Sequence, residues 1–175
     1  MKTLSLDDFL QQQEFHIAEA RAGKIFIYPT DTVYGIWALY TPENINRIIE
    51  IKKSTDRWQP SIIVPHFERI QKRFPHADIE KMKEQLQQYH GVTYIFDYNK
   101  PWMRIIKHPI QEFVTNLDEW FISTSCNLTG QPTITEIKDI PSEICSKVDY
   151  IIDGGIWWGR ASVLIDFVLN KVIER

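Results

Sequence analysis

Two short segments of this 175-residue sequence concentrate small polar side chains that could bind an anionic ligand. Residues 28–35 read YPTDTVYG, and residues 123–130 read STSCNLTG. Each follows an apolar run of the length expected for a buried strand. Hydroxyls and backbone amides at the carboxyl end of a strand are well placed to bind phosphate or carboxylate oxygens. The alternative is that each segment is only a turn whose polar groups satisfy their own backbone.

A lysine on an apolar stripe is the third feature that points to chemistry. Ile45, Ile48 and Ile49 follow helical spacing, and Lys52 takes the next place on the same stripe. Either its stem lies along the core and the amine reaches solvent, or the amine points into a site at the end of the helix. Alone, the lysine favours the first interpretation. Together with the two polar segments, it favours a ligand site.

Other catalytic patterns are absent from the sequence. It contains neither the Gly-x-x-x-x-Gly-Lys-Ser/Thr motif nor the Gly-x-Gly-x-x-Gly motif, so neither a P-loop nor a dinucleotide-binding fold is indicated. The two cysteines and the five histidines lack the spacing of metal ligands. Cys126 is a weak candidate for a nucleophile, because no histidine lies near it in the sequence.

Secondary-structure elements that would position these segments do not alternate regularly. Ser5 and Asp8 form a capping pair for a helix that we expect to end at Gly23. Thr41 and Pro42 are typical of the start of another helix. We expect further helices at 79–89 and 110–117, and strands at 24–28, 61–64, 92–98, 121–124, 150–152 and 162–168. This order predicts an α/β fold of the α+β-like kind, with a single twisted mixed sheet flanked by helices.

Composition places few further limits on function. The length suits one domain spanning residues 1–175, and 43% hydrophobic with 25% charged residues is ordinary for a globular protein. A net charge of −3 argues against a generally basic surface for nucleic acid, although a local basic cleft is compatible with it. No apolar run is long enough to span a bilayer, and the N-terminus lacks the apolar core of a signal peptide. We therefore expect a cytoplasmic protein without membrane contact.

The polar segments resemble, in order, the motifs of the YrdC-like threonylcarbamoyl-AMP synthase family. Residues 28–35 resemble its YPTDTVYGL motif, and residues 121–130, FISTSCNLTG, resemble its ISTSANLSG motif. Residues 103–109, MRIIKHP, are similar to its VRVPxHP motif. The DGG of residues 153–155 and the SVLID of residues 162–166 resemble its DGG…STVVD pattern. The resemblance covers the chain from about Ile25 to Phe167.

This resemblance implies a YrdC-like fold with a concave, positively charged cleft, and it implies an enzyme. Members make threonylcarbamoyl-AMP from L-threonine, bicarbonate and ATP, with release of pyrophosphate. Mg²⁺ shares the task of offsetting the charge of the phosphates. The product supplies a modified adenosine of tRNA, so the implied partners include tRNA or double-stranded RNA and a downstream tRNA-modification transferase complex.

The resemblance also assigns site residues by position. Its catalytic residues correspond to Lys52, Ser125 and Asn127. Its substrate-binding residues correspond to Thr30, Thr32, Tyr34, Arg57, Ser123, Arg104 and Ser162, and no metal ligand is assigned.

The sequence departs from the family pattern beside Lys52. The arginine of the family's Lys-x-Arg motif is replaced by Ser54, and the nearby DKPL reads RWQP at residues 57–60. Arg57 is the candidate to supply the missing charge. Two alternatives to an active synthase are a non-catalytic YrdC-like paralogue that binds nucleotide or RNA, and a hydrolase or adenylyl transferase that acts on another small acid.

Overall fold

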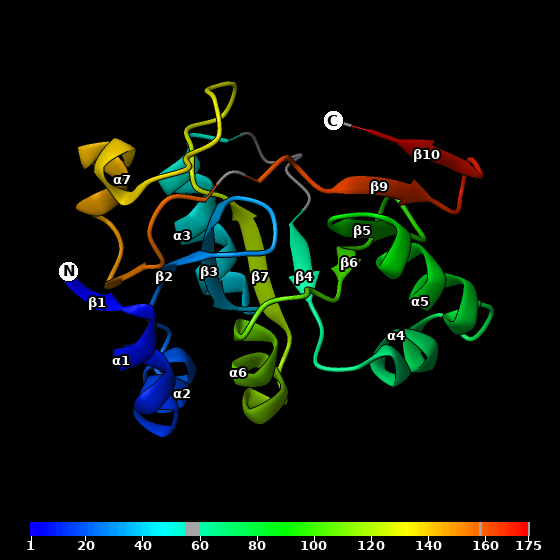
Figure 1. Cartoon of the computed structure of the whole chain (residues 1–175), viewed down its shortest axis with the longest axis horizontal. Helices are drawn as coiled ribbons and strands as arrows, with labels where there is room; N and C mark the ends of the chain where they lie inside the picture. Colours follow the sequence, from blue (N-terminus) through cyan, green and yellow to red (C-terminus); the bar gives the residue numbers. More distant parts are fainter. Residues whose placement is uncertain (55–59, 158, 175) are drawn as a thin grey trace.

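The computed structural model describes residues 1–54, 60–157 and 159–174, and these form one mixed sheet with helices on its faces (Figure 1). Its strand order is β1-β8-β2-β3-β7-β4-β6-β5-β9-β10. The neighbours β2 and β3, β3 and β7, and β4 and β7 are antiparallel, whereas β2 and β8, β4 and β6, and β5 and β9 are parallel. The strands are β1 Lys2–Ser5, β2 Phe26–Pro29, β3 Tyr34–Leu39, β4 Ser61–Ile63, β5 Val92–Ile95, β6 Trp102–Arg104, β7 Phe121–Ser125, β8 Tyr150–Asp153, β9 Val163–Asp166 and β10 Lys171–Ile173.

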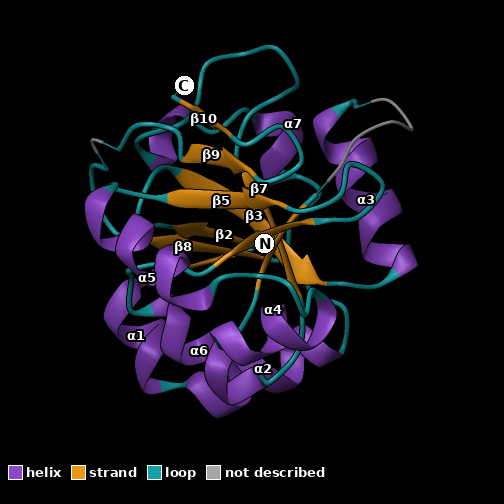
Figure 2. Cartoon of the chain, turned by 90° about the vertical axis from the view of Figure 1, so that its right-hand side faces the viewer, coloured by secondary structure: helices purple, strands orange, loops and turns teal. Residues whose placement is uncertain are grey.

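Helices cover both faces of the central strands. The helices are α1 Leu6–Gln11, α2 Gln13–Arg21, α3 Pro42–Lys52, α4 Phe67–Arg73, α5 Ile79–Gln88, α6 Ile110–Leu117 and α7 Ser142–Cys145, with a short 3-10 helix at Ile137–Asp139. Figure 2 shows α3 and α7 on the opposite side of the strands from α1, α2 and α6. The buried side chains agree with this view, because one core cluster joins α1, α2 and α6 to the sheet and a second joins α3 and α7 to its other face. A third cluster joins α4 and α5 to β4, β5 and β6. The expected single twisted mixed sheet flanked by helices is therefore confirmed.

Local capping signals predicted helix starts well. The Ser5 hydroxyl accepts a hydrogen bond from the backbone N–H of Asp8 at 3.1 Å, and the Thr41 hydroxyl accepts one from the N–H of Asn44 at 3.2 Å. The expected first helix is nevertheless divided into α1 and α2 at Gln12. The backbone of Gln12 leaves helical geometry, with φ −110° and ψ 32°, and its N–H is shared between the carbonyls of Asp8 and Phe9.

The segment of residues 28–35 has a different shape from the one expected. It is not a loop after a strand but a β-hairpin, in which β2 pairs with β3 from Phe26↔Trp37 to Pro29↔Tyr34. Residues 30–33 form the connection between the two strands. The strands β1, β3, β6 and β10 and the helices α4 and α7 were not expected from the sequence.

None of the helices formed by the described residues has both the length and the apolar character that crossing a membrane requires.

Candidate ligand-binding cleft

One face of the sheet changes from core to cleft along its strands. In β7, Phe121 is buried in the core, whereas Ser123 and Ser125 line a cleft of about 490 Å³. These three residues point to the same side because alternate residues of a strand share a face. β3 repeats the change, with Trp37 in the core and Gly35 in the cleft. The cleft is therefore the continuation of the face that carries the core packed against α1, α2 and α6.

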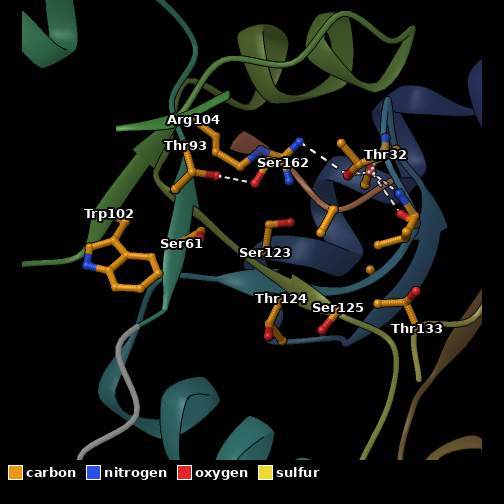
Figure 3. Close-up of a pocket in the computed structure, with 14 residues that line it drawn as sticks. Thr32, Ser61, Thr93, Trp102, Arg104, Ser123, Thr124, Ser125, Thr133 and Ser162 are labelled. Atoms are coloured by element: carbon orange, nitrogen blue, oxygen red, sulfur yellow. Dashed lines mark hydrogen bonds between the residues drawn. The ribbon is translucent and has the colours of Figure 1, made fainter. Parts of the chain in front are cut away.

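Hydroxyl groups dominate the lining of this cleft. In Figure 3, Trp102 and Ser61 lie at one end, Thr32 and Thr133 lie at the other, and Arg104 reaches between them. The hydroxyl-bearing residues are Thr30, Thr32, Ser61, Thr93, Ser123, Thr124, Ser125, Thr133 and Ser162. The other lining residues are Val33, Gly35, Trp102, Arg104 and Ala161.

The connection between β2 and β3 is fixed by its own threonines. The Thr30 hydroxyl accepts hydrogen bonds from the N–H groups of Thr32 (3.0 Å) and Val33 (3.2 Å), and it lies 2.8 Å from the Val33 carbonyl oxygen. The Thr30 and Thr32 hydroxyl oxygens are 2.9 Å apart. Thr30 thus satisfies its own turn, as the simpler interpretation of this segment expected, and both threonines also line the cleft.

A buried ion pair crosses the same region. Arg104 Nη2 lies 2.6 Å from Asp31 Oδ1, and the two side chains are only 8% and 3% exposed. Arg104 Nη2 also lies 3.4 Å from the Thr32 hydroxyl, and Arg104 Nε is buried without a partner in the described structure. Because a charge is costly to bury alone, the carboxylate stabilises the guanidinium at this position.

The hydroxyls of Thr93 and Ser162 meet beside Arg104. Their oxygens are 2.8 Å apart, and both residues are almost fully buried. Thr93 belongs to β5 and Ser162 directly precedes β9, the parallel neighbour of β5. This pair therefore lines the cleft on the side where β5 and β9 are neighbours.

Lys52 is not among the described lining residues of the cleft, and it holds the segment that follows β7. Its Nζ donates hydrogen bonds to the carbonyl oxygens of Ser125 (2.6 Å) and Asn127 (2.8 Å) and to Asn127 Oδ1 (3.3 Å). The residue is 5% exposed, and burial lowers the pKa of its ammonium to about 8. The amine is therefore engaged by protein oxygens, so the interpretation in which it reaches solvent is wrong, and its part in a ligand site stays a prediction.

Asn127 and Tyr34 are also enclosed by protein. Asn127 Oδ1 accepts a hydrogen bond from the Ser125 hydroxyl at 2.5 Å, and Asn127 Nδ2 donates to the Gln131 carbonyl. The Tyr34 hydroxyl donates to the Gly155 carbonyl (2.8 Å) and accepts from the Gly154 N–H (3.0 Å). Burial raises the pKa of Tyr34. Both side chains are placed to hold the segments that border the cleft.

The sequence-predicted site residues therefore divide into two groups. Thr30, Thr32, Arg104, Ser123, Ser125 and Ser162 line the cleft. Lys52, Asn127 and Tyr34 are buried and are not among its described lining residues, and Arg57 lies outside the described residues. Ser54, which takes the place of the family arginine, has its hydroxyl 2.7 Å from the hydroxyl of Thr129.

Several lining residues were not predicted from the motifs. Ser61 lies opposite Ser123 in β7 and opposite Trp102 in β6, so these three side chains share one row of the sheet. Their sequence neighbours give no sign of this row. Thr93 and Thr133 likewise belong to no motif. Only the strand register, which joins distant segments, would have identified them.

Nucleophilic and metal chemistry find little support among the described side chains. Cys126 is fully buried, and burial raises the pKa of its thiol to about 12, so the reactive thiolate is strongly disfavoured. Its burial therefore agrees with the sequence analysis, which gave Cys126 little weight as a nucleophile. Across residues 1–54, 60–157 and 159–174, no group of three or more His, Cys, Asp or Glu side chains could hold a metal ion.

Comparison with known proteins identifies relatives that match most of this chain. The model of the Sua5_yciO_yrdC family, described as "Telomere recombination", matches residues 19–174. Threonylcarbamoyl-AMP synthase of Vibrio campbellii is 25% identical over an alignment of 154 positions that covers 77% of this chain and 82% of that protein.

Solved structures show the same fold. The structure of P. abyssi Sua5 complexed with L-threonine superposes with a TM-score of 0.73 at 21% identity, and the match covers 91% of this chain and 52% of that one. The present chain thus spans about half the length of that Sua5 chain. E. coli YciO superposes with a TM-score of 0.73 at 18% identity, over 94% of this chain and 88% of that one.

Proposed function

Because the chain belongs to the Sua5/YciO/YrdC family, we propose that it is an L-threonylcarbamoyl-AMP synthase, a nucleotidyltransferase. In this proposal it joins L-threonine, bicarbonate and ATP and releases pyrophosphate. The Vibrio campbellii relative, which is named threonylcarbamoyl-AMP synthase, supports the reaction, and the complex of P. abyssi Sua5 with L-threonine supports L-threonine as a substrate. The observation that carries the proposal is a cleft in which one guanidinium is surrounded by hydroxyl groups and no carboxylate is part of the described lining.

The lining suits a ligand with phosphate and carboxylate oxygens. Arg104 supplies a permanent positive charge, and the hydroxyls of Ser162 and Thr93 lie beside it. Hydroxyl groups rotate to donate hydrogen bonds to anionic oxygens. At the other end of the cleft, Thr32 and Thr133 border the space that we assign to the smaller, zwitterionic substrate.

The proposed chemistry needs positioning and charge rather than an enzyme nucleophile. The amine of threonine combines with bicarbonate to give a carbamate and water. A carbamate oxygen then attacks the α-phosphorus of ATP, and the bond from that phosphorus to the pyrophosphate oxygen breaks. Negative charge grows on the departing pyrophosphate, so a fixed guanidinium near the phosphates lowers the barrier. Arg104 is the residue to which we assign this role.

Mg²⁺ is a poor match for the side chains of the cleft. This ion prefers carboxylate and phosphate oxygens, whereas the described lining offers hydroxyls and a guanidinium. Asp31, the nearby carboxylate, is committed to Arg104. We therefore propose that Mg²⁺ enters with ATP, bound to its phosphates, and we assign no step to a metal held by the protein.

Lys52 and Asn127 have a supporting role in this proposal. The Lys52 ammonium fixes two carbonyl oxygens and one amide oxygen of the segment that carries Ser125. This fixes the shape of that segment, so Ser125 meets the substrate while Lys52 and Asn127 act from behind. Tyr34 supports the segment at Gly154 and Gly155 in the same way.

We propose a cellular role by the same reasoning. Residues 1–175 form a single YrdC-like domain that acts in the cytoplasm. Its product is passed to a downstream tRNA-modification transferase complex, and the protein contacts tRNA or double-stranded RNA during this transfer. These parts rest on the family and not on a feature of the cleft.

A non-catalytic paralogue that binds nucleotide is the second candidate function. Ser54 favours it, because the family's arginine at this position is absent and the Ser54 hydroxyl is engaged with Thr129. A radiolabelled-threonine assay with ATP and bicarbonate distinguishes the two. The synthase should give labelled product only when both bicarbonate and ATP are present. Binding of ATP without labelled product would favour the paralogue.

A further inference from the structure

Asp31 lies on the far side of Arg104 from the cleft, and its two carboxylate oxygens have separate partners. Oδ1 lies 2.6 Å from Arg104 Nη2, and Oδ2 accepts a hydrogen bond from the backbone N–H of Lys107 at 3.2 Å. We propose that Asp31 is a positioning residue, which fixes the guanidinium of Arg104 in the orientation that meets an anion in the cleft. The identity of that anion as the triphosphate of ATP rests on the proposed function.

The contacts of Arg104 are one-sided. Among the described residues, only Nη2 donates hydrogen bonds, to Asp31 and, at 3.4 Å, to the Thr32 hydroxyl. Nε is buried without a partner. An arginine side chain has several flexible torsions, and a carboxylate contact at one nitrogen restricts the orientations that the rest of the planar group can take. In Figure 3 the guanidinium lies between Thr32 and Ser162, and Ser123 lies below it in this view.

The position of Asp31 is itself fixed. Its bond to the Lys107 N–H joins the connection between β2 and β3 to the chain that leaves β6, the strand of Arg104. Gly91 packs closely on the same place, because a Cβ added there would lie 2.5 Å from Thr32 Cγ2 and 3.6 Å from Asp31 Oδ2. Asp31 also borders a second cavity, which includes Lys107 and His108, on the side away from the cleft. The ion pair is thus part of the wall between the two cavities.

The effect of Asp31→Asn on anion binding has opposite directions for a residue that positions Arg104 and for one that acts only by its charge. Asp31 is negative and close to the proposed anion site, so Coulomb's law alone predicts that Asp31→Asn strengthens the binding of an anion. If Asp31 acts by holding Arg104, the same substitution weakens the binding of the anion. Asn has the shape of Asp and keeps an acceptor for the Lys107 N–H, so the change mainly removes the charge that fixes the guanidinium.

The experiment compares wild type, Asp31→Asn, Arg104→Gln and the double variant by calorimetric titration with ATP. Asp31→Asn should weaken binding about tenfold, the effect of losing one charge-assisted contact. It should add little in the Arg104→Gln background, because two residues that share one function are not additive. A merely structural role of Asp31 predicts an equal loss in both backgrounds.

A ligand-free measurement keeps the inference independent of the proposed activity. The side-chain ¹⁵N signals of Arg104, assigned by their loss in Arg104→Gln, should show a restricted guanidinium in wild type and a freely rotating one in Asp31→Asn. An unchanged signal, or tighter binding of the anion by Asp31→Asn, would overturn the inference. If wild type binds pyrophosphate but not ATP, the proposed function fails, and the same comparison with pyrophosphate still tests Asp31. Binding of neither anion overturns both.

Discussion

The ammonium of Lys52 meets Asn127 twice, at 2.8 Å from its carbonyl oxygen and at 3.3 Å from Oδ1. The two residues are 75 positions apart, and this contact joins the end of α3 to the segment after β7. Within the described part of the chain, the hydrogen-bond acceptors of this lysine are carbonyl and amide oxygens, so dipoles rather than a carboxylate satisfy its buried charge. Such a cation has a large influence on the stability and the shape of the segment that it holds.

Replacing Lys52 with methionine should destabilise the protein strongly. Methionine fills the space of the stem but leaves the carbonyl oxygens of Ser125 and Asn127 without their donor, at a cost of about 2–4 kcal/mol in the free energy of unfolding. Denaturant titration measures the loss. Lys53→Gln is the matched control, because Lys53 is adjacent and 62% exposed in a surface ion pair, where little stability is at stake. Equal stability of wild type and Lys52→Met would contradict the role of Lys52 as a support.

Lys52 also shows what the sequence could predict and what it could not. Its place on the apolar stripe of a helix identified it as unusual, and the helix start at Thr41 and Pro42 was correct. Its partners could not be derived, because they depend on how β7 leaves the sheet. The same distinction applies to the hydroxyls, since Ser123 and Ser125 belong to a motif and Ser61 joins them only through the register of β4 with β7.

Unexpected strands have a similar physical explanation. The strand β3 was missed because the turn before it lies inside the polar motif of residues 28–35. Residues 30–33 of the motif form the hairpin connection, so no separate turn signal marks the start of β3. β6 and β10 have three residues each, too few for alternation to be recognised, whereas β4, of the same length, was expected from the apolar run at residues 62–64. By contrast, α6 begins and ends at the expected residues, since its strong apolar periodicity is local. Local patterns were thus sufficient for α3, α5 and α6 but not for α4 and α7, and the row of cleft residues required the sheet.

Gly35→Ala should damage the floor of the cleft. A Cβ at this position would lie 2.3 Å from Trp37 Nε1 and 3.2 Å from the carbonyl oxygen of Thr124. Trp37 is fully buried and cannot move without disturbing the core, so we expect a loss of about 1–3 kcal/mol in stability. Gly130→Ala serves as the comparison. It has a positive φ of 82° but no atom within 4 Å of the added Cβ, so it reports backbone strain without a clash.

Thermal unfolding measured by near-ultraviolet circular dichroism would test the Gly35 prediction, because the signal of Trp37 depends on its packing. Gly35→Ala should lower the melting temperature more than Gly130→Ala does. A larger effect of the Gly130 variant would mean that the tryptophan adapts and that Gly35 is not needed for the cleft.

Acid should weaken the fold through His16. This histidine is 1% exposed, neither ring nitrogen has a partner in the described structure, and its ring stacks on Phe9 at 4.6 Å between centroids. Burial lowers its pKa below the ordinary value of 6.5. The unfolded chain therefore binds a proton at a higher pH than the folded protein does. The resulting stability is complete above about pH 6.5 and is lost progressively as the pH falls below it.

The variant His16→Phe isolates this effect. Phenylalanine keeps the aromatic stack and cannot take up a proton, so the variant should lose less stability than wild type between pH 7 and pH 5. Urea titrations at both pH values measure the difference, and His76→Gln, at an exposed histidine, is the control that should follow wild type. Parallel losses in wild type and His16→Phe would show that other groups cause the acid sensitivity.

Ser54 gives the sharpest test of the proposed activity. If the absent arginine limits the protein, Ser54→Arg should increase the affinity for ATP about tenfold, the value of one charge-assisted contact with phosphate. Ser54 follows the left-handed C-cap at Lys53 and is hydrogen-bonded to Thr129, so Ser54→Ala is needed to separate the loss of that bond from the gain of a charge. If Arg57 already supplies the charge, Ser54→Arg should change little, and Arg57→Ala should weaken binding. The double variant Ser54→Arg with Arg57→Ala shows whether an arginine at position 54 replaces the charge of Arg57 or adds to it. Two groups that bind the same phosphate have effects on affinity that are not additive. If no variant alters ATP binding, this stretch of chain lies away from the nucleotide, and the correspondence with the Lys-x-Arg motif is wrong.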